Sequence, residues 1–378
     1  MVPWSSRKLT SLDGVRGLAI IAVVFYHLSN SLVIMGPLTR FLCHTFSFGW
    51  AGVDLFFVLS GFLITGILLD TRPAENYFSS FYARRALRIF PLAYAFLLFG
   101  FTFFPRWVSP QAMPLDADRW VYFCYLTNWL FLWKGKVGRT VLGHFWTLAV
   151  EEQFYLVWPL CVRVLRARVL LPVLLATEAA VIAGRWWWVA IHGASTALAW
   201  ATISRMDGLL LGAVVAIVVR RYTVPGPLVN ALPWICGAGL ICFPAVIDRR
   251  NEAAIQTAGL PILAILFAGL VLYAVLTDRQ PVWPQRFLCW KRLTNVGKYA
   301  YGIYVYHPVI LYFRATFLGT WEWPWFSYLG AVATCAIVYF VAKLSYLCFE
   351  RYLLAFKDRF APRYAVQPVA ARCGVETR

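Results

Sequence analysis

Long apolar runs separated by short polar segments repeat along the whole chain. A helix needs about 20 predominantly apolar residues to cross a bilayer. Ten runs approach that length, and they lie near residues 15–35, 50–69, 88–105, 145–162, 169–187, 204–219, 228–247, 257–276, 298–318 and 326–348. The pattern predicts an all-α integral membrane protein, a bundle of about ten transmembrane helices.

An eleventh apolar stretch, residues 120–133, is shorter than the others. Counting it as a span would move two basic segments, 163–168 and 220–221, to the outer side. Basic residues concentrate in cytoplasmic loops, so this arrangement is disfavoured. We therefore expect residues 120–133 to form a re-entrant or interfacial segment, and both termini to be cytoplasmic.

No linker or shift in composition divides the chain. We expect one transmembrane domain over residues 8–350 and a short cytoplasmic tail over residues 351–378. After Lys357 the tail has scattered charges and little periodicity, so it is expected to be disordered or to lie on the membrane surface.

Composition and charge agree with a membrane protein. Of 378 residues, 61% are hydrophobic and 14% are charged, which is more apolar surface than one soluble core can bury. The net charge of +18 comes largely from basic residues that flank the apolar runs, so the expected partner is the lipid bilayer and not nucleic acid. The nine cysteines include no CxxC pair, and we expect no metal site and no bound cofactor.

Ionisable side chains within the apolar runs are candidates for function, because an unpaired charge in a bilayer is costly. In the first span, Arg16 and His27 are eleven residues apart, which is about 20° of rotation and roughly 16 Å of rise along one helix face. We expect Arg16 at the cytoplasmic end and His27 near mid-membrane. Asp13 either pairs with Arg16 or begins the helix. A histidine that only bonds a neighbouring helix is the alternative interpretation of His27.

A basic cluster, Arg84, Arg85 and Arg88, lies at the cytoplasmic end of the third span. The positive-inside rule explains it as well as anion recognition does, so both interpretations stay open. Arg85 and Arg88 share a helix face and offer planar donors suited to phosphate. With Arg16 they would form a cytoplasmic phosphate-binding site, to which we also assign Arg84.

Carboxylates complete the expected chemistry. Glu151 and Glu152 are adjacent in the fourth span, so their side chains point about 100° apart and at most one need face a given cavity. Either could act as a base, as a partner to His27, or as an interhelical clamp. Asp54 could orient His27 or cap its own helix. Further candidates for a polar cavity are Ser60, His144, Trp146, Gln153, Tyr155, Arg205, Asp207, Tyr304 and His307, although Arg205 and Asp207 could instead pair with each other.

Four motifs, in order along the chain, resemble those of the acyltransferase family 3 membrane proteins, which include bacterial polysaccharide O-acetylases. They are Leu12–Ala19 with His27 at an Arg-x10-His spacing, Gly52–Leu63, Arg84–Pro91, and His144–Tyr155. The resemblance covers roughly residues 8–350. It departs at Thr147, where many members carry Ser, and at Tyr299–Tyr301, where a Ser-Tyr pattern is commoner.

The resemblance implies a membrane O-acyltransferase in the bacterial inner membrane. An acyl group, often acetyl, would pass from cytoplasmic acyl-CoA, the co-substrate, to a hydroxyl of a glycan or glycolipid acceptor of the cell envelope. Arg16, Arg85 and Arg88 would contact the donor. His27 would carry the transfer, either as general base or as transient acyl acceptor. The chain ends soon after its last span, so we expect no appended extracytoplasmic esterase-like domain.

Two other classes of protein remain alternatives. His27, Asp54 and Glu151 or Glu152 could form the proton relay of a proton-coupled transporter or exporter. The same polar groups could also only lock the helices of a scaffold together. Neither alternative requires the arginines to bind a phosphate-bearing donor, which is where the hypotheses differ.

Overall fold

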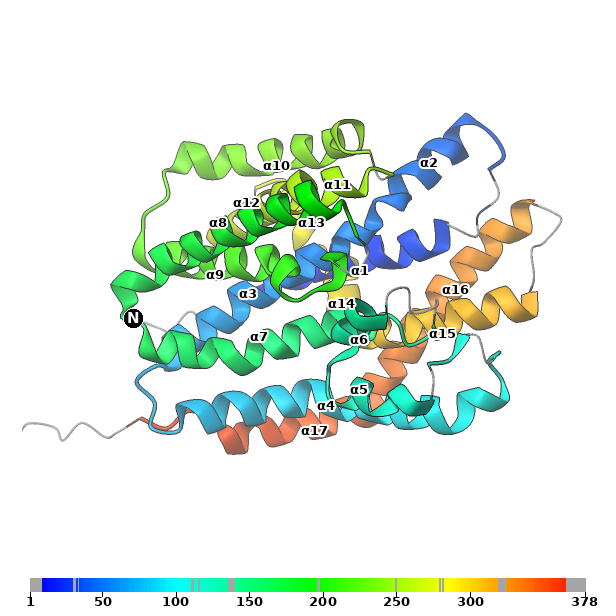
Figure 1. Ribbon diagram of the computed structural model, residues 1–378, viewed down its shortest axis with the longest axis horizontal. Coiled ribbons are helices and arrows are strands. Elements are labelled where there is room, and N and C mark those ends of the chain that lie inside the picture. The colour runs from blue at the N-terminus through cyan, green and yellow to red at the C-terminus, as the bar shows by residue number, and fades with distance from the viewer. Residues whose placement is uncertain are drawn as a thin grey trace, which may run out of the picture.

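The computed structural model describes residues 9–364, apart from 30–31, 33, 110–111, 115, 135–139, 196–197, 249, 279, 281 and 319–323. Within these ranges the chain forms helices and turns and no strand. The long helices are α1 (Thr10–Ser29), α3 (Gly52–Thr71), α4 (Tyr77–Phe103), α7 (Phe145–Val164), α8 (Ala167–His192), α9 (Asp207–Arg221), α10 (Gly226–Val246), α12 (Leu260–Leu276), α15 (Ala300–Leu318) and α16 (Pro324–Ser345). Most of them lie roughly side by side in one bundle (Figure 1).

The shorter helices join or extend these. They are α2 (Pro37–Ser47), η2 (Gly49–Ala51), η3 (Phe104–Arg106), η5 (Asp116–Asp118), α5 (Arg119–Phe123), α6 (Thr127–Lys134), η6 (Leu198–Trp200), η7 (Ile203–Arg205), α11 (Glu252–Ala254), η8 (Ile255–Gly259), α13 (Gln285–Leu288), α14 (Lys291–Lys298), η9 (Tyr346–Glu350), α17 (Arg351–Ala355) and η10 (Phe356–Phe360).

The expected spans coincide with the ten long helices, but the number of ten spans is not confirmed. Seven helical segments in the described part of the chain are long and apolar enough to cross a membrane: Thr10–Ser29, Pro37–Thr71, Tyr77–Arg106, Ala167–His192, Gly226–Val246, Glu252–Leu276 and Phe326–Phe360. Helix α9 has only 15 residues, and α7 contains Glu151, Glu152 and Gln153, which lower its hydropathy. The chain is a multi-pass membrane protein.

Residues 120–133 do not cross the membrane as one helix. They form α5 and α6, which have five and eight residues and are each too short to span. Helix α5 packs against α4, and α6 packs against α7. These short helices agree with a segment that does not span as one helix, and its re-entrant or interfacial placement stays a prediction.

Helices α3 and α9 make the most extensive contact between any two elements. A side chain at Gly61 would bring its Cβ within 2.0 Å of the Leu209 carbonyl oxygen, so only glycine allows this approach. Ion pairs hold both ends of the contact: Arg205 with Asp54 at 2.8 Å, and Arg220 with Asp70 at 2.9 Å. This pair of helices forms a rigid frame beside α7.

Helix α14 packs closely against the beginning of α1. At Gly297 a Cβ would lie 1.7 Å from the Asp13 carbonyl oxygen, which excludes any larger residue without a shift of the backbone. The contact places Lys298, the last residue of α14, at the same cavity as Arg16 of α1.

The segment after α16, as far as residue 364, is folded against α4. After α16 the helix continues through η9, α17 and η10, and α17 lies along the first half of α4 (Figure 1). Ser80 donates a hydrogen bond of 2.6 Å to the Phe360 carbonyl oxygen, and the Arg363 amide donates one of 2.7 Å to Asn76. Of the two alternatives expected after Lys357, disorder is excluded for residues 358–364, because α4 supplies hydrogen-bond partners far away in the sequence. A position on the membrane surface stays a prediction.

Candidate functional site

A polar cavity lies between α3, α4, α7, α14 and the first turns of α15. Three arginines line it: Arg16 from α1, and Arg85 and Arg88 from α4. Lys298 and one carboxylate, Glu151, line it as well. The structure thus brings together three of the four arginines that the sequence assigned to one site, and Arg84 is the one that does not line the cavity.

The cations of the cavity are poorly matched by acids. Arg16 pairs with Asp13 at 2.5 Å. Among the described residues, Arg85 and Arg88 have no ion pair or hydrogen bond. The Arg85 guanidinium instead lies over the ring of Tyr155, 5.7 Å from its centroid. Two guanidinium groups with free donors at one cavity are suited to a phosphate-bearing ligand.

Only one of the adjacent carboxylates faces this cavity, as the helix geometry predicted. Glu151 lines it and accepts a hydrogen bond of 2.6 Å from Ser60 of α3. Glu152 points elsewhere, and its Oε1 is buried without a partner in the described part of the chain.

Tyr125 is a residue that sequence reasoning missed. Its backbone has a φ of 53°, in the left-handed region that residues other than glycine rarely adopt. Its ring packs 5.4 Å from that of Phe90, centroid to centroid. Its hydroxyl is buried, and the described residues offer it no partner. Burial and the neighbouring Glu152 raise the pKa of this hydroxyl, so it stays protonated. No sequence pattern could have revealed a tyrosine in this backbone conformation.

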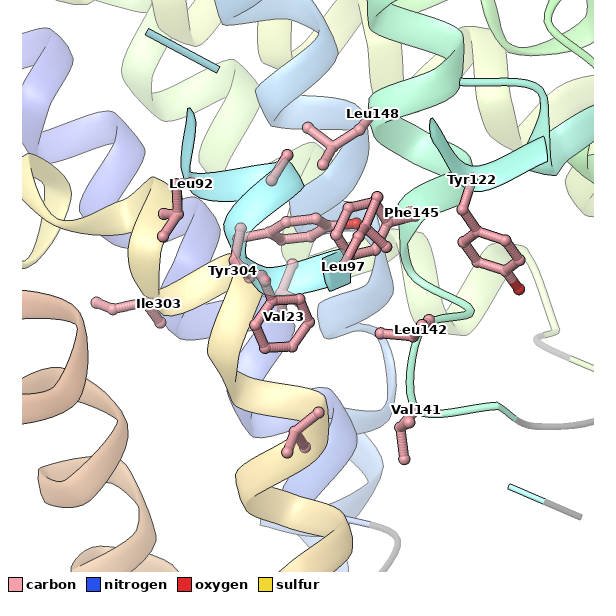
Figure 2. Close-up of a cluster of buried hydrophobic side chains, with 14 of the residues drawn as sticks. Val23, Leu92, Leu97, Tyr122, Val141, Leu142, Phe145, Leu148, Ile303 and Tyr304 are labelled. Carbon is pink, nitrogen blue, oxygen red and sulfur yellow. The ribbon is translucent and has the colours of Figure 1, made fainter. Parts of the chain in front are cut away.

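Tyr304 and Thr147 close the inner end of the cavity. Their hydroxyl oxygens are 2.5 Å apart, and Tyr304 also donates to the His144 carbonyl oxygen at 2.9 Å. Figure 2 shows Tyr304 on α15 within an apolar cluster that includes Val23, Leu97 and Phe145. The apolar packing holds the tyrosine ring in place, and its hydroxyl fixes α15 to the start of α7.

Three histidines lie together next to Tyr304, and none of them lines the cavity. The His307 ring is 5.2 Å from that of His27 and 5.7 Å from that of His144, centroid to centroid. The Tyr304 ring is 5.6 Å from His307. His27 lies in the last turn of α1, because α1 ends at Ser29 and not near residue 35, so it is not in the middle of its helix. Its side chain is exposed.

His307 is held in one tautomer. Its Nδ1 lies 2.8 Å from the Tyr304 carbonyl oxygen, which can only accept, so Nδ1 carries the proton. Nε2 is then the unprotonated nitrogen, and it is buried with no partner among the described residues. No hydrogen bond or ion pair joins His27 to a carboxylate in the same part of the chain, so the expected link from His27 to Asp54 or the glutamates is not seen.

Asp54, Arg205 and Asp207 belong to a separate, buried group of charges. Arg205 pairs with Asp54 at 2.8 Å, and the Arg185 guanidinium of α8 binds both carboxylate oxygens of Asp207. The four side chains, called the ion-pair cluster below, are each no more than 7% exposed. Arg205 and Asp207 therefore do not pair with each other. The Arg205 guanidinium also lies 5.5 Å from the centroid of the Trp146 ring, so the candidate Trp146 packs against the ion-pair cluster.

Gln153 and Arg84 lie outside the cavity. Gln153 donates to the Tyr125 carbonyl oxygen at 2.8 Å and to Asn128 at 2.9 Å, and it accepts from Trp129 at 3.0 Å. Its amide is fully used in holding α6 to α7, which is a structural role. Arg84 is half-buried on α4 and does not line the cavity. No group of three or more His, Cys, Asp or Glu side chains in the described ranges could hold a metal ion.

Comparisons with known proteins identify the family of the chain. The model of a family described as an acyltransferase domain matches residues 9–343. The chain is 26% identical over 364 residues to O-acetyltransferase OatA of Staphylococcus aureus, covering 92% of this chain and 57% of that protein. It is 27% identical over 391 residues to peptidoglycan O-acetyltransferase OatA of Listeria monocytogenes, covering 94% and 59%. A putative O-acetyltransferase of S. aureus is 24% identical over 372 residues, covering 91% and 57%. The chain thus spans less than two thirds of the length of these relatives. No solved structure matches it significantly.

Proposed function

Because the chain belongs to this acyltransferase domain family, we propose that it is a membrane O-acyltransferase that moves an acyl group from a phosphate-bearing donor to a glycan hydroxyl. One observation supports the proposal most strongly: Arg16, Arg85 and Arg88 line a single cavity that also includes Tyr304, and the Tyr304 ring contacts His144 and His307, the second of which contacts His27. Tyr304 and His307 thus lie between the phosphate site and His27, the group that would accept a proton.

The donor that fits best is acyl-CoA, with acetyl as the acyl group. Its phosphates would bind Arg85 and Arg88, whose guanidinium groups have no hydrogen bond or ion pair among the described residues. Its thiol arm would extend along the cavity toward Tyr304. The basic mouth of the cavity faces the cytoplasm in this proposal, since acyl-CoA is a cytoplasmic metabolite and basic loops are retained on that side.

The transfer itself takes place at His27. The acceptor hydroxyl gives its proton to the His27 imidazole while its oxygen attacks the acyl carbonyl carbon. The carbon–sulfur bond breaks, and the leaving thiolate takes the proton from the imidazolium. His307 orients His27, because its tautomer is fixed and its ring lies 5.2 Å away. The acyl group reaches His27 only when the contact between Tyr304 and Thr147 opens.

The acceptor approaches His27 from outside the cavity. His27 is exposed although it does not line the cavity, so a second substrate can reach it by another route. The relative named as a peptidoglycan O-acetyltransferase makes peptidoglycan fragments the first acceptor to test. Other cell-envelope glycans are the next candidates.

A transfer assay in liposomes tests the proposed function. Wild type is expected to move radiolabelled acetyl from acetyl-CoA to peptidoglycan fragments or another envelope glycan. His27→Ala should lower kcat by about 10²- to 10⁴-fold, the usual contribution of a general base, with the same folded yield. His307→Ala should lower kcat by about tenfold and alter the pH profile of kcat while leaving KM for the donor unchanged. Equal rates in all three proteins, or no dependence on acetyl-CoA, would refute the proposal.

A further inference from the structure

The C-terminal segment runs antiparallel to the first turns of α4. Ser80 donates to the Phe360 carbonyl oxygen at 2.6 Å, and the Asn76 amide donates to the Ala361 carbonyl oxygen at 3.0 Å. The Glu75 amide donates to the Arg363 carbonyl oxygen at 2.9 Å. Residue numbers therefore rise along α4 as they fall along η10 and α17. This antiparallel register determines which residues of α4 lie opposite those of η10 and α17.

This register places Lys357 beside Arg84. Lys357 lies one turn before Phe360, and Arg84 lies one turn after Ser80. Because the two segments are antiparallel, both residues lie on the same side of the hydrogen bond that joins Ser80 and Phe360. The cations that repel the Lys357 ammonium are Arg84, Arg88 and Arg85, with Arg84 the strongest.

The carboxylate next to Lys357 offsets little of the positive charge gathered there. Asp358, which follows Lys357 in the chain, is a carboxylate that offsets part of the repulsion on Lys357, and it is exposed. Lys357 itself is half-buried. Folding thus brings a lysine from the end of the chain against three arginines, and such a concentration of like charge is destabilising unless an anion binds there.

Lys357 and Arg84 also lie outside the cavity, whereas Arg85 and Arg88 line it. Arg88 is four residues from Arg84 and three from Arg85, so it connects the two groups on neighbouring faces of α4. A ligand that binds both groups must carry two separate anionic parts, one inside the cavity and one at its mouth.

We propose that Arg84 and Lys357 form a second phosphate subsite, which binds a monophosphate on the nucleotide end of the donor while Arg16, Arg85 and Arg88 bind its diphosphate. This inference rests on the proposed function. It makes the substrate a nucleotide thioester with two separated phosphate groups, such as a 3′-phosphorylated adenosine diphosphate carrier. In that orientation the thiol arm enters the cavity and the nucleotide stays at the mouth.

Binding of CoA and of 3′-dephospho-CoA to the purified full-length protein tests the subsite. Wild type should bind CoA about tenfold or more tightly than dephospho-CoA, the difference expected for one charge-assisted phosphate contact. Lys357→Ala should weaken CoA binding by a similar factor and leave dephospho-CoA binding unchanged, so that the two affinities become nearly equal. Lys357→Arg should restore most of the preference for CoA.

Arg359→Ala is the matched control. It removes one positive charge from the same segment, but Arg359 is exposed and lies over the ring of Phe356, 4.7 Å from its centroid. This variant should keep the wild-type preference. If Lys357→Ala, with an unchanged melting temperature, also keeps that preference, the subsite does not exist, although the donor cavity stands. If wild type binds neither ligand, the proposed donor and this inference are both wrong.

Discussion

Two groups of charged side chains lie among the helices, and they differ in how their charges are matched. In the ion-pair cluster, Asp54, Arg185, Arg205 and Asp207 are joined in two buried pairs between α3, α8 and the start of α9. In the cavity, Arg85 and Arg88 have no acid partner among the described residues.

The difference separates structural from functional charge. Both groups contain arginines within apolar segments, and the sequence made Arg16, Arg85 and Arg88 the donor-site candidates and Arg205 a further cavity candidate. A buried charge whose partner is already present has no free donor for a substrate, and removing one partner leaves the other uncompensated. A charge left unpaired at a cavity is available to a ligand. Substitutions in the two groups should therefore affect different properties.

The largest expected effect is on stability, in the ion-pair cluster. Arg205→Ala leaves Asp54 buried without its partner and should lower the free energy of unfolding by about 3–5 kcal/mol. Denaturant unfolding of the purified protein in detergent measures this loss. Replacing both members of the pair with apolar residues, Asp54→Leu and Arg205→Met, should be less damaging than the single change. If the Arg205→Ala protein is as stable as wild type and has lost only donor binding, the ion-pair cluster does not have the structural role proposed for it.

A smaller effect, on function, is expected in the cavity. Arg88→Ala removes a charged donor to the ligand, so KM for acetyl-CoA should rise by about 10- to 100-fold while the melting temperature stays the same or increases slightly. Steady-state kinetics and thermal unfolding measure the two quantities on one preparation. Arg292→Ala provides the control, because Arg292 is an exposed cation of α14 that packs over Trp290. A loss of stability without a change in KM would assign Arg88 to the structural group.

The smallest effect is expected at the boundary between cavity and histidines. Tyr304→Phe removes the hydroxyl that contacts Thr147 and the His144 carbonyl oxygen, and should cost about 1 kcal/mol of stability. Because the barrier at the inner end of the cavity is weakened, hydrolysis of acetyl-CoA without acceptor should increase. Thr147→Val removes the other hydroxyl of the same contact, so it should also increase hydrolysis of acetyl-CoA without acceptor. Unchanged hydrolysis in both variants would show that this contact does not limit access to His27.

The sequence predicted where the helices lie and that Arg16, Arg85 and Arg88 lie together, although it also placed Arg84 with them, and Arg84 does not line the cavity. The apolar runs fixed the helices because each must meet the bilayer or another helix with an apolar surface. Arg85 and Arg88 are close in sequence, so helix periodicity alone puts them on one face. The same geometry predicted that at most one of Glu151 and Glu152 need face the cavity, but only the structure shows that it is Glu151.

The pairing of distant residues could not be predicted in this way. Asp54 pairs with a residue 151 positions later, and nothing in the local pattern near either residue specifies that partner. The same holds for the contact between His27 and His307, and for Lys357, whose position depends on hydrogen bonds from Ser80 and Asn76. Helix ends are also poorly defined by hydropathy, which is why His27 was expected in the middle of its span.

The most direct test of the account compares donor binding with transfer in two variants. Purified wild type, His27→Ala and Arg88→Ala are titrated with CoA, and the rate of acetyl transfer is measured on the same samples. His27→Ala should bind CoA as wild type does and transfer almost nothing, whereas Arg88→Ala should bind at least about tenfold more weakly. If Arg88→Ala binds CoA as tightly as wild type, or if wild type does not bind it, the cavity is not the donor site.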